Sequence, residues 1–152
     1  MQKKWIKPTQ GFTLLEVVIV LVIIGVIAAL VVPNITGSLD KARLDAAKQD
    51  ILSLENALTM YKADNMRLPT TEQGLQALVA KPTIAPIPSN WRAGGYLSKT
   101  DLPKDPWGND FKYLNPGVRN TAKVDIISYG ADGQPGGEGE AADFGNWKDA
   151  VQ

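Results

Sequence analysis

The sequence predicts an α+β protein in which one long amino-terminal helix leads into a small globular head. An unbroken apolar run occupies residues 17–32, and a segment with helical periodicity follows over residues 38–65. Two short stretches with strand-like alternation come nearer the carboxyl end. Together, the apolar run and the periodic segment predict one curved helix from Phe12 to about Asp64, half apolar and half amphipathic.

The composition narrows the classes of function before any motif is considered. The chain has 152 residues and a formal net charge of +0, so charge alone does not indicate a nucleic-acid partner, and we expect none. It contains no cysteine, which excludes disulfides, thiolate metal sites and cysteine nucleophiles. It also contains no histidine, the commonest general base. Since no constellation of bases or nucleophiles is visible, we do not expect an enzyme.

Residues 12–33 are predicted to form a transmembrane helix. Thr13 and Glu16 are the only polar residues before the proline that closes this stretch, and about 20 apolar residues suffice to cross a bilayer. Three lysines and no acidic residue precede it, so the positive-inside rule places the amino terminus in the cytoplasm. The run alone also fits a cleaved secretory signal peptide or an ordinary signal anchor.

Glu16 and the junction before Phe12 are explained by neither of these simpler readings. The stretch MQKKWIKPTQG, followed by FTLLEVVIVLVIIGVIAALVVP, resembles the class III signal of type IV pilins and pseudopilins. In that family a membrane peptidase cuts after the glycine, the new terminal Phe is N-methylated, and a glutamate is kept five residues into the mature chain. The resemblance implies that residues 1–11 are a leader, cleaved between Gly11 and Phe12, and that Phe12 is methylated.

The resemblance also suggests a role for Glu16 in assembly. Cleavage would create an ammonium group on Phe12, and residues four apart share a helix face. A neighbouring subunit can offer the same ammonium to the same carboxylate, and a carboxylate left unpaired in apolar surroundings is costly. We therefore expect Glu16 to set the register of subunits in a filament. Stabilisation of Glu16 by the helix dipole is the simpler alternative.

Residues 34–65 are predicted to continue the helix into the head. Apolar residues recur there at intervals of four and three, which is typical of a helix with one buried face. The predicted stripe consists of Ala47, Ile51, Leu54, Leu58 and Tyr61. Residues 25–37 contain two glycines and Pro33, and proline removes a helical hydrogen bond. We therefore expect a bent or locally meltable stretch that is helical in the membrane monomer.

Residues 66–152 are predicted to form the globular head, with a modest core. Thr70 and Gln73 have the spacing of a capping box, so a short helix should follow, to about Val79. Prolines and glycines mark residues 82–95 as a loop.

Strands are expected near residues 110–114 and over residues 123–130. An Asn-Pro-Gly turn separates them, so we expect an antiparallel pair that covers the apolar stripe of the helix. Trp107 and Trp147 are expected in the core of the head.

Residues 129–147 form an acidic, glycine-rich loop. Glycines let a chain turn its carbonyls inward, and carboxylate and carbonyl oxygens are the ligands that calcium prefers. A small head without disulfides often needs such a staple. The loop lacks the alternating acids of an EF-hand, and its local pattern leaves open a calcium loop and a solvated flexible loop.

Segments along the whole chain are similar to one family, the major pseudopilins of type II secretion systems, often called general secretion pathway protein G. The segments are TTEQGLQAL, GGYL, DPWGNDFKYLNPG, VDIISYGADG and DFGNW. The similarity extends from Gly11 to Trp147. It implies the type IV pilin-like lollipop fold, with a long helix packed on a head that carries a short antiparallel sheet and a calcium loop.

The resemblance implies that Ca²⁺ is bound by two or more acidic side chains and several main-chain carbonyls. Carried over by position, the side-chain ligands are Asp132 and Asp143, and the carbonyl donors are Tyr129 and Gln134. Ala142 stands where shorter loops have the first of two adjacent aspartates, so Glu138, Glu140 or a further carbonyl would replace that ligand.

The function implied by the resemblance is that of a major pseudopilin. Such subunits polymerise into the periplasmic pseudopilus and drive the export of folded proteins across the outer membrane. The implied partners are further copies of the chain, minor pseudopilins, the inner-membrane assembly platform, the prepilin peptidase and, before assembly, the lipid bilayer. The implied location is the inner membrane, with a single pass, a cytoplasmic amino terminus and a periplasmic head.

Three other functions are weighed against this one. A type IV pilin for adhesion, motility or DNA uptake is the closest, but such pilins usually close their last loop with a disulfide. A minor pseudopilin frequently lacks the glutamate found here as Glu16. A membrane-anchored binding module with a calcium-stiffened loop would have no reason to carry GFTLLE.

Overall fold

The structure, a computed structural model, describes residues 12–120 and 123–147, and for residues 30–38 it describes the backbone alone. Its elements in chain order are α1 (Leu14–Asn65), η1 (Leu75–Leu78), β1 (Lys112–Leu114), β2 (Asp125–Ser128), η2 (Gly130–Asp132), η3 (Gly139–Ala141) and β3 (Phe144–Gly145), where η marks a 3₁₀ helix. The chain divides into two compact units, Met1–Leu39 and Asp40–Gln152. The predicted leader lies outside the described residues.

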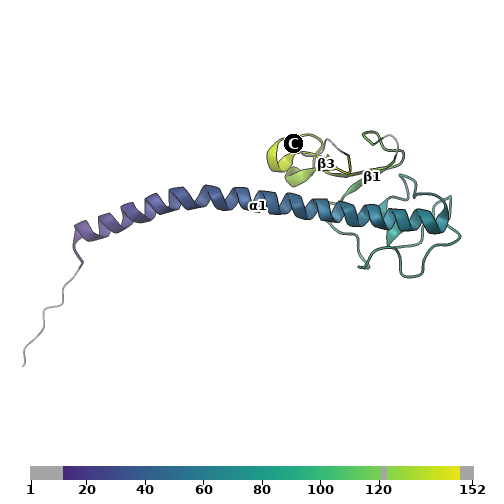
Figure 1. The fold of residues 1–152 in the computed structure, drawn as a ribbon, viewed down its shortest axis with the longest axis horizontal. Helices are drawn as coiled ribbons and strands as arrows, with labels where there is room; N and C mark the ends of the chain where they lie inside the picture. Colours follow the sequence, from purple (N-terminus) through teal and green to yellow (C-terminus); the bar gives the residue numbers. More distant parts are fainter. Residues whose placement is uncertain (1–11, 121–122, 148–152) are drawn as a thin grey trace, which may run out of the picture. The chain divides into compact units, whose positions relative to one another are not determined.

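Helix α1 has nearly the predicted bounds (Figure 1). Residues 25–37, predicted as a bent or locally meltable stretch, are helical in their backbone. Judged on the described residues, none of the helices combines the length and the apolar character needed to cross a membrane. The predicted transmembrane segment, residues 12–33, extends past Ala29 to side chains that lie outside the described part, and it stays a prediction.

The end of α1 is set by local geometry. Met66 has a φ of 59°, the left-handed conformation that often closes a helix. The Nδ2 of Asn65 donates a hydrogen bond to the Tyr61 carbonyl oxygen at 3.0 Å, which satisfies an acceptor of the last turn.

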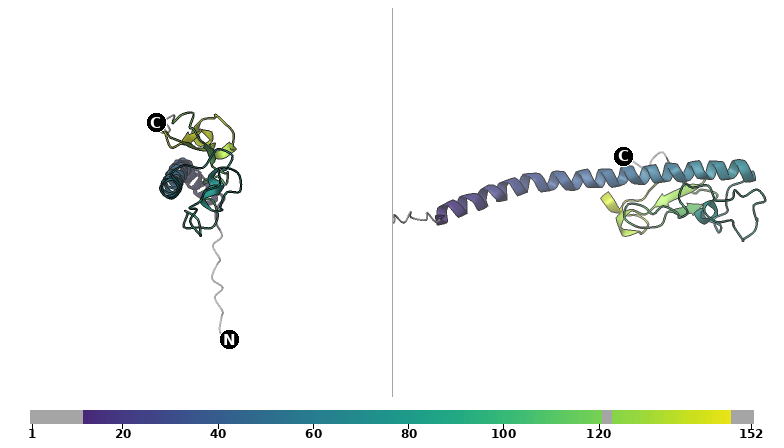
Figure 2. Two further views of the ribbon diagram at one scale, coloured as in Figure 1. Left: turned by 90° about the vertical axis from the view of Figure 1, so that its right-hand side faces the viewer. Right: turned by 90° about the horizontal axis from the view of Figure 1, so that it is seen from below.

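Within the second unit, the predicted stripe of α1 forms one wall of the core. Ala47, Leu54 and Tyr61 are 0% exposed, and the other two stripe residues are also buried. They pack with apolar side chains of the head, among them Leu78, Tyr113, Ile126 and Phe144. The strands and loops of the head lie along this part of α1 in the views of Figures 1 and 2. The amphipathic helix predicted from the spacing is therefore confirmed.

The head contains a three-stranded antiparallel sheet with the order β1-β2-β3. The predicted antiparallel pair is confirmed, with Tyr113 opposite Ile126. The strands are shorter than predicted, since Asp110 forms only an isolated bridge with Lys104. All four residues of β2 are buried. The third strand, β3, was not predicted.

The capping box is confirmed in both directions. The Thr70 Oγ1 accepts the Gln73 N–H at 3.2 Å, and the Gln73 Oε1 accepts the Thr70 N–H at 3.1 Å. The segment that follows is a turn and then the 3₁₀ helix η1, whereas the sequence predicts one short helix to about Val79. Gly74 has a φ of 59°, which an α-helix cannot accommodate, so the segment tightens instead.

Candidate functional site

The first candidate site is the start of α1. Thr13 precedes the helix, and its Oγ1 accepts a hydrogen bond from the Glu16 N–H at 3.2 Å. This N-cap satisfies one of the backbone donors that a helix start leaves unpaired. Glu16 lies in the first turn, where the helix dipole favours a negative charge. The cleavage bond predicted before Phe12 involves Gly11, which lies outside the described residues.

The helix surface around Glu16 is apolar on every side. Each large apolar side chain from Phe12 to Ile27 is between 47% and 86% exposed. These side chains are Phe12, Leu14, Leu15, Val17, Val18, Ile19, Val20, Leu21, Val22, Ile23, Ile24, Val26 and Ile27. Contiguous apolar surfaces of this kind mark sites of contact with another protein or with lipid.

The second candidate site is the acidic loop, which is built on a buried polar cluster at the end of β2. The Asp105 carboxylate is buried and accepts the Ser128 hydroxyl at 2.6 Å and the Asn109 N–H at 2.7 Å. The Asn109 Nδ2 donates to the Gly130 carbonyl oxygen at 2.8 Å. Residues outside the loop therefore fix its first turn. None of these three polar residues was predicted as part of the site, although DPWGND carries two of them.

The two predicted carboxylate ligands lie near the two ends of this loop. The Asp132 Oδ1 accepts the Gln134 N–H at 3.1 Å, and the Asp143 Oδ1 accepts the Gly136 N–H at 3.0 Å. Each aspartate thus stabilises a turn with one of its oxygens. Within the described residues, no group of three or more acidic side chains converges as a metal site would. A calcium ion here would depend on two carboxylates together with main-chain carbonyls.

The backbone of the loop is compatible with such a donor set. A Cβ at Gly130 would overlap the Glu140 carbonyl oxygen, and a Cβ at Gly137 would overlap the Ala141 carbonyl oxygen. Both glycines have positive φ values, so the close approach depends on glycine. η2 and η3 are in contact. A folded loop that carries carboxylates and main-chain carbonyls fits the chemistry of Ca²⁺.

The Glu140 carboxylate contacts one residue of α1 and one residue of the head. Its Oε1 accepts the Arg43 Nη1 at 2.8 Å and the Trp107 Nε1 at 3.4 Å. These interactions, the one with Arg43 first, hold the pKa of Glu140 below its usual value. Partial burial, followed by the proximity of Glu140, raises the pKa of Asp40. Glu140 links the loop to α1, whereas Glu138, the other predicted replacement ligand, is exposed.

Asp143 has a cationic neighbour that the sequence analysis did not identify. The Arg119 Nη2 lies 3.7 Å from the Asp143 Oδ2. The same guanidinium lies over the Trp147 ring, 4.6 Å from its centroid. Trp147 was predicted to be in the core, but it is only partly buried and covers Gly145, where a Cβ would overlap its ring. Trp107 does pack against the core, as predicted.

Asn146 is a further residue that the sequence analysis missed. Its Oδ1 accepts the Ile126 N–H at 3.0 Å, and its Nδ2 donates to the Val124 carbonyl oxygen at 2.9 Å. The same Nδ2 lies 3.0 Å from the Glu55 Oε1 on α1. Asn146 thus attaches the end of the loop to β2 and to the helix. Its position in DFGNW was the signal available in the sequence.

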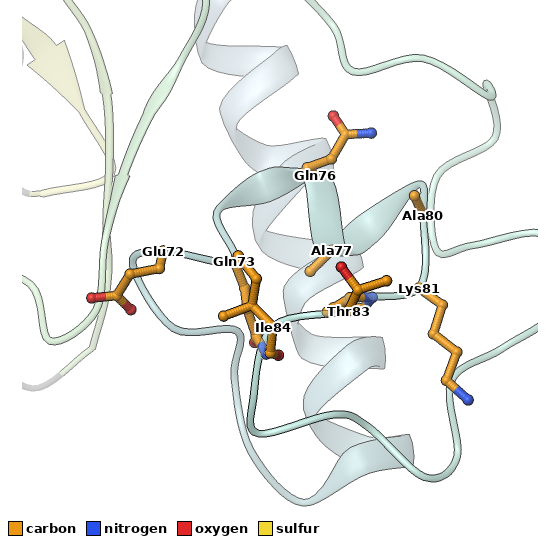
Figure 3. A pocket seen from close by; sticks show the side chains of 9 residues that line it. Glu72, Gln73, Gln76, Ala77, Ala80, Lys81, Thr83 and Ile84 are labelled. Carbon is orange, nitrogen blue, oxygen red and sulfur yellow. The ribbon is translucent and has the colours of Figure 1, made fainter.

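A hollow between residues 72–77 and 80–84 is shown in Figure 3. Its charged side chains are Glu72 and Lys81, and they are directed away from each other. The Gln73 Nε2 donates to the Ile84 carbonyl oxygen at 2.8 Å, so this amide holds the surrounding loop together. The hollow contributes to the structure of the head and presents no set of converging reactive groups.

Two family models match the chain. The model of the type II secretion system protein G matches residues 34–147. The model of the prokaryotic N-terminal methylation motif matches residues 6–32, which include the predicted processing site and Glu16.

Curated relatives are similar over nearly the whole chain. Type II secretion system core protein G of Vibrio cholerae serotype O1 is 58% identical over 145 residues, which cover 95% of this chain and 95% of that protein. The core protein G of Pectobacterium carotovorum is 56% identical over 138 residues, with 91% of this chain and 84% of that protein covered.

A solved structure is similar as well. It is the crystal structure of the major pseudopilin from the type 2 secretion system of enterohaemorrhagic Escherichia coli, with a TM-score of 0.65 and 50% sequence identity. The similarity covers 77% of this chain and 96% of that one. Together with the methylation motif, it indicates an inner-membrane pseudopilin associated with secretion machinery. The chain therefore belongs to the protein G family of type II secretion systems, the major pseudopilins, which are structural proteins and not enzymes.

Proposed function

We propose that the chain polymerises into the periplasmic pseudopilus of a type II secretion system. The observation that carries the proposal is the amino-terminal half of α1, where apolar side chains are exposed on all faces. Removing apolar surface from water is favourable by about 25 cal/mol per Å². Lipid supplies the apolar surroundings before assembly, and the helices of neighbouring subunits supply them in the filament.

Membership of the family supports a proposed route to the filament. Residues 12–33 hold the subunit in the inner membrane, with the amino terminus in the cytoplasm and the head in the periplasm. The prepilin peptidase removes residues 1–11, Phe12 is methylated, and the inner-membrane assembly platform moves the subunit from lipid into the filament. Minor pseudopilins join the same filament, and its growth drives folded proteins across the outer membrane.

Glu16 has the role of a register residue in this proposal. Its carboxylate is the one acidic group among the exposed apolar side chains of this half of α1. The terminal ammonium of Phe12 in a neighbouring subunit would pair with it only when the helices are correctly staggered. A charge paired in an apolar bundle costs far less than an unpaired one, so the correct stagger is selected.

The test compares two carboxylates of the same helix. In Glu16→Gln, we expect normal membrane insertion and cleavage, while filament formation and secretion fall close to the level of cells that lack the protein. Asp45→Asn is the matched control, since Asp45 is exposed on the amphipathic part of α1, 3.8 Å from Lys48. Crosslinking, electron microscopy and a secretion assay give the readouts. Normal filaments from Glu16→Gln would contradict the register role.

We further propose that the loop of residues 129–147 binds one Ca²⁺ ion. Asp132 and Asp143 would hold it with side-chain oxygens, and Tyr129 and Gln134 with carbonyl oxygens. The bound ion would supply a divalent crosslink between the two ends of the loop. The donor chemistry and the tight glycine turns support this proposal, and the contact between Arg43 and Glu140 reduces the part that Glu140 could take.

Calcium binding is tested by thermal unfolding of the full chain in detergent. We expect the wild type to melt at a higher temperature in calcium than in chelator, because an ion that binds only the folded state stabilises it by RT ln(1 + [L]/Kd). In Asp132→Asn this difference should shrink strongly. Asp101→Asn, an exposed head residue outside the loop, is the control. Equal melting of the wild type in calcium and chelator would refute the site.

A further inference from the structure

Arg119 is held beside a predicted calcium ligand by two residues that are not predicted ligands, Asp125 and Trp147. Its backbone N–H is donated to the Asp125 Oδ2 at 2.8 Å, and the neighbouring N–H of Val118 reaches the same oxygen at 2.7 Å. The Asp125 side chain is 0% exposed. A buried carboxylate with several backbone donors is a rigid anchor, so the main chain at Arg119 is fixed.

The side chain of Arg119 is also held in place. The guanidinium lies 4.6 Å from the centroid of the Trp147 ring, within the range of a cation–π interaction. The ring is itself packed over Gly145, where no side chain could fit. Asp143 and the Trp147 ring that Arg119 covers belong to the same short segment, at the two sides of β3. The guanidinium lies 3.7 Å from the Asp143 Oδ2.

Asp143 is well shielded on its other side. Its side chain is 12% exposed, and its Oδ1 is already engaged by the Gly136 N–H at 3.0 Å. The Oδ2 is the oxygen that faces Arg119. A carboxylate so enclosed needs a positive charge nearby, because burial of an unpaired charge is costly.

We propose that Arg119 is an internal cation that competes with calcium for Asp143. The inference rests on the proposed calcium site and adds a residue that regulates its affinity. In the calcium-free protein the guanidinium neutralises Asp143 and keeps the loop closed. Calcium binding weakens the pair of Arg119 with the Oδ2, because two cations held close to one carboxylate repel each other. The Arg119 side chain is 54% exposed, so it can move into solvent while staying near Trp147.

The size of the competition follows from the exposure of the pair. Partly exposed ion pairs contribute little, so loss of the competitor should raise calcium affinity by about two- to fivefold. Without calcium the pair stabilises the loop. Loss of Arg119 then leaves the Asp143 charge without a partner and loosens the loop. Arg119→Gln should therefore lower the melting temperature in chelator. In saturating calcium it should leave the melting temperature nearly unchanged.

The experiment measures calcium binding to the full chain in detergent by isothermal titration calorimetry, with tryptophan fluorescence as a second readout. The variants are Arg119→Gln and, as a control of equal charge change, Lys81→Gln, which removes an exposed lysine from the hollow of Figure 3. We expect tighter binding in Arg119→Gln alone, together with a lower melting temperature in chelator. The fluorescence of Trp147 should respond to calcium in the wild type and less in Arg119→Gln.

The outcomes separate the two proposals. Equal dissociation constants in the wild type and Arg119→Gln would overturn the role of Arg119 and leave the calcium site in place. Absence of binding in both proteins would overturn the calcium site and the competition together.

Discussion

The two halves of α1 use apolar residues in opposite ways. From Phe12 to Ile27 nearly every residue is apolar, and all the large side chains are about half exposed or more. From Ala47 to Tyr61 polar residues are interspersed, and the apolar stripe with intervals of three and four is buried in the head. One helix thus contains a segment whose apolar stripe is covered by the head of the same chain, and a segment whose apolar side chains stay exposed.

The difference indicates how many partners each segment needs. A helix with one apolar stripe requires one covering surface, and the chain supplies it with η1 and the sheet. A helix that is apolar all round must be surrounded, either by lipid or by other helices. The first segment is therefore adapted to contacts outside the molecule, and the second to the stability of the head.

The strongest test of this comparison is a pair of leucines on the same helix. Leu54 is 0% exposed and Leu21 is 62% exposed. We expect Leu54→Ala to lower the free energy of unfolding of the head by about 2–5 kcal/mol, as buried leucines do. Leu21→Ala should change it by less than about 0.5 kcal/mol. Chemical denaturation of the full chain in detergent, followed by tryptophan fluorescence, gives both values.

Filament assembly should depend more on Leu21 than on Leu54, once the effect of each substitution on head stability is taken into account. If filament contacts bury the first segment, Leu21→Ala weakens assembly although the head is as stable as in the wild type. Similar losses of head stability from both variants would show that the two segments are not independent, and the comparison would fail.

A somewhat smaller effect is expected from the buried anchor of the head. The Asp125 carboxylate accepts three backbone N–H groups, from Val118, Arg119 and Asn120. Hydrogen bonds to a charged group are worth about 1.5–3 kcal/mol, so Asp125→Asn should destabilise the head by about 2 kcal/mol. Asp45→Asn on the exposed face of α1 should change little. Denaturant midpoints measure both, and an unaffected Asp125→Asn would show that the loop does not depend on this anchor.

Local patterns predicted much of the fold. The stripe of α1 follows from spacing alone, because a period near 3.6 residues places those side chains on one face. The capping box at Thr70 and the antiparallel pairing of β1 with β2 also depend on residues that are close in sequence. These features need no knowledge of distant partners.

Features that depend on distant partners were missed. Strand β3 has only two residues, and it is a strand because Phe144 lies opposite Ser128 of β2. Nothing in the alternation of so short a segment could predict it. Asn146 likewise acts through partners on β2 and α1, and Trp147 was placed in the core because its contact with Arg119 could not be foreseen.

The candidate sites divide in the same way. Asp132 and Asp143 were found by their position in a resembling loop, and each does stabilise a turn there. The residues that fix the loop from outside, such as Asp105, come from segments more than twenty positions away. Sequence reasoning predicted carboxylates as ligands, which stays a prediction, but it did not identify the groups that hold the loop in place.

The smallest expected effect compares two helix caps, one in each unit. Thr70 caps the turn before η1 through the Gln73 N–H, and Thr13 caps α1 through the Glu16 N–H, both at 3.2 Å. Loss of an N-cap hydroxyl costs about 1 kcal/mol when the capped segment is part of the folding unit. Thr70→Ala should therefore destabilise the head by about 1 kcal/mol. Thr13→Ala should leave head unfolding unchanged, because Thr13 lies in the first unit and the described core of the head is formed by residues from Leu44 onward.

The pH dependence sharpens this last test. The backbone N–H of Glu72 and then the Thr70 hydroxyl hold the pKa of Glu72 below its usual value. A carboxyl with a lowered pKa stabilises the folded state above its unfolded pKa, and that contribution is lost as the pH falls through the folded pKa. Thr70→Ala should raise the pKa of Glu72, which NMR titration measures, and the stability difference from the wild type should narrow in acid. A difference that stays constant down to full protonation would mean that Thr70 acts through the capping bond to Gln73 alone.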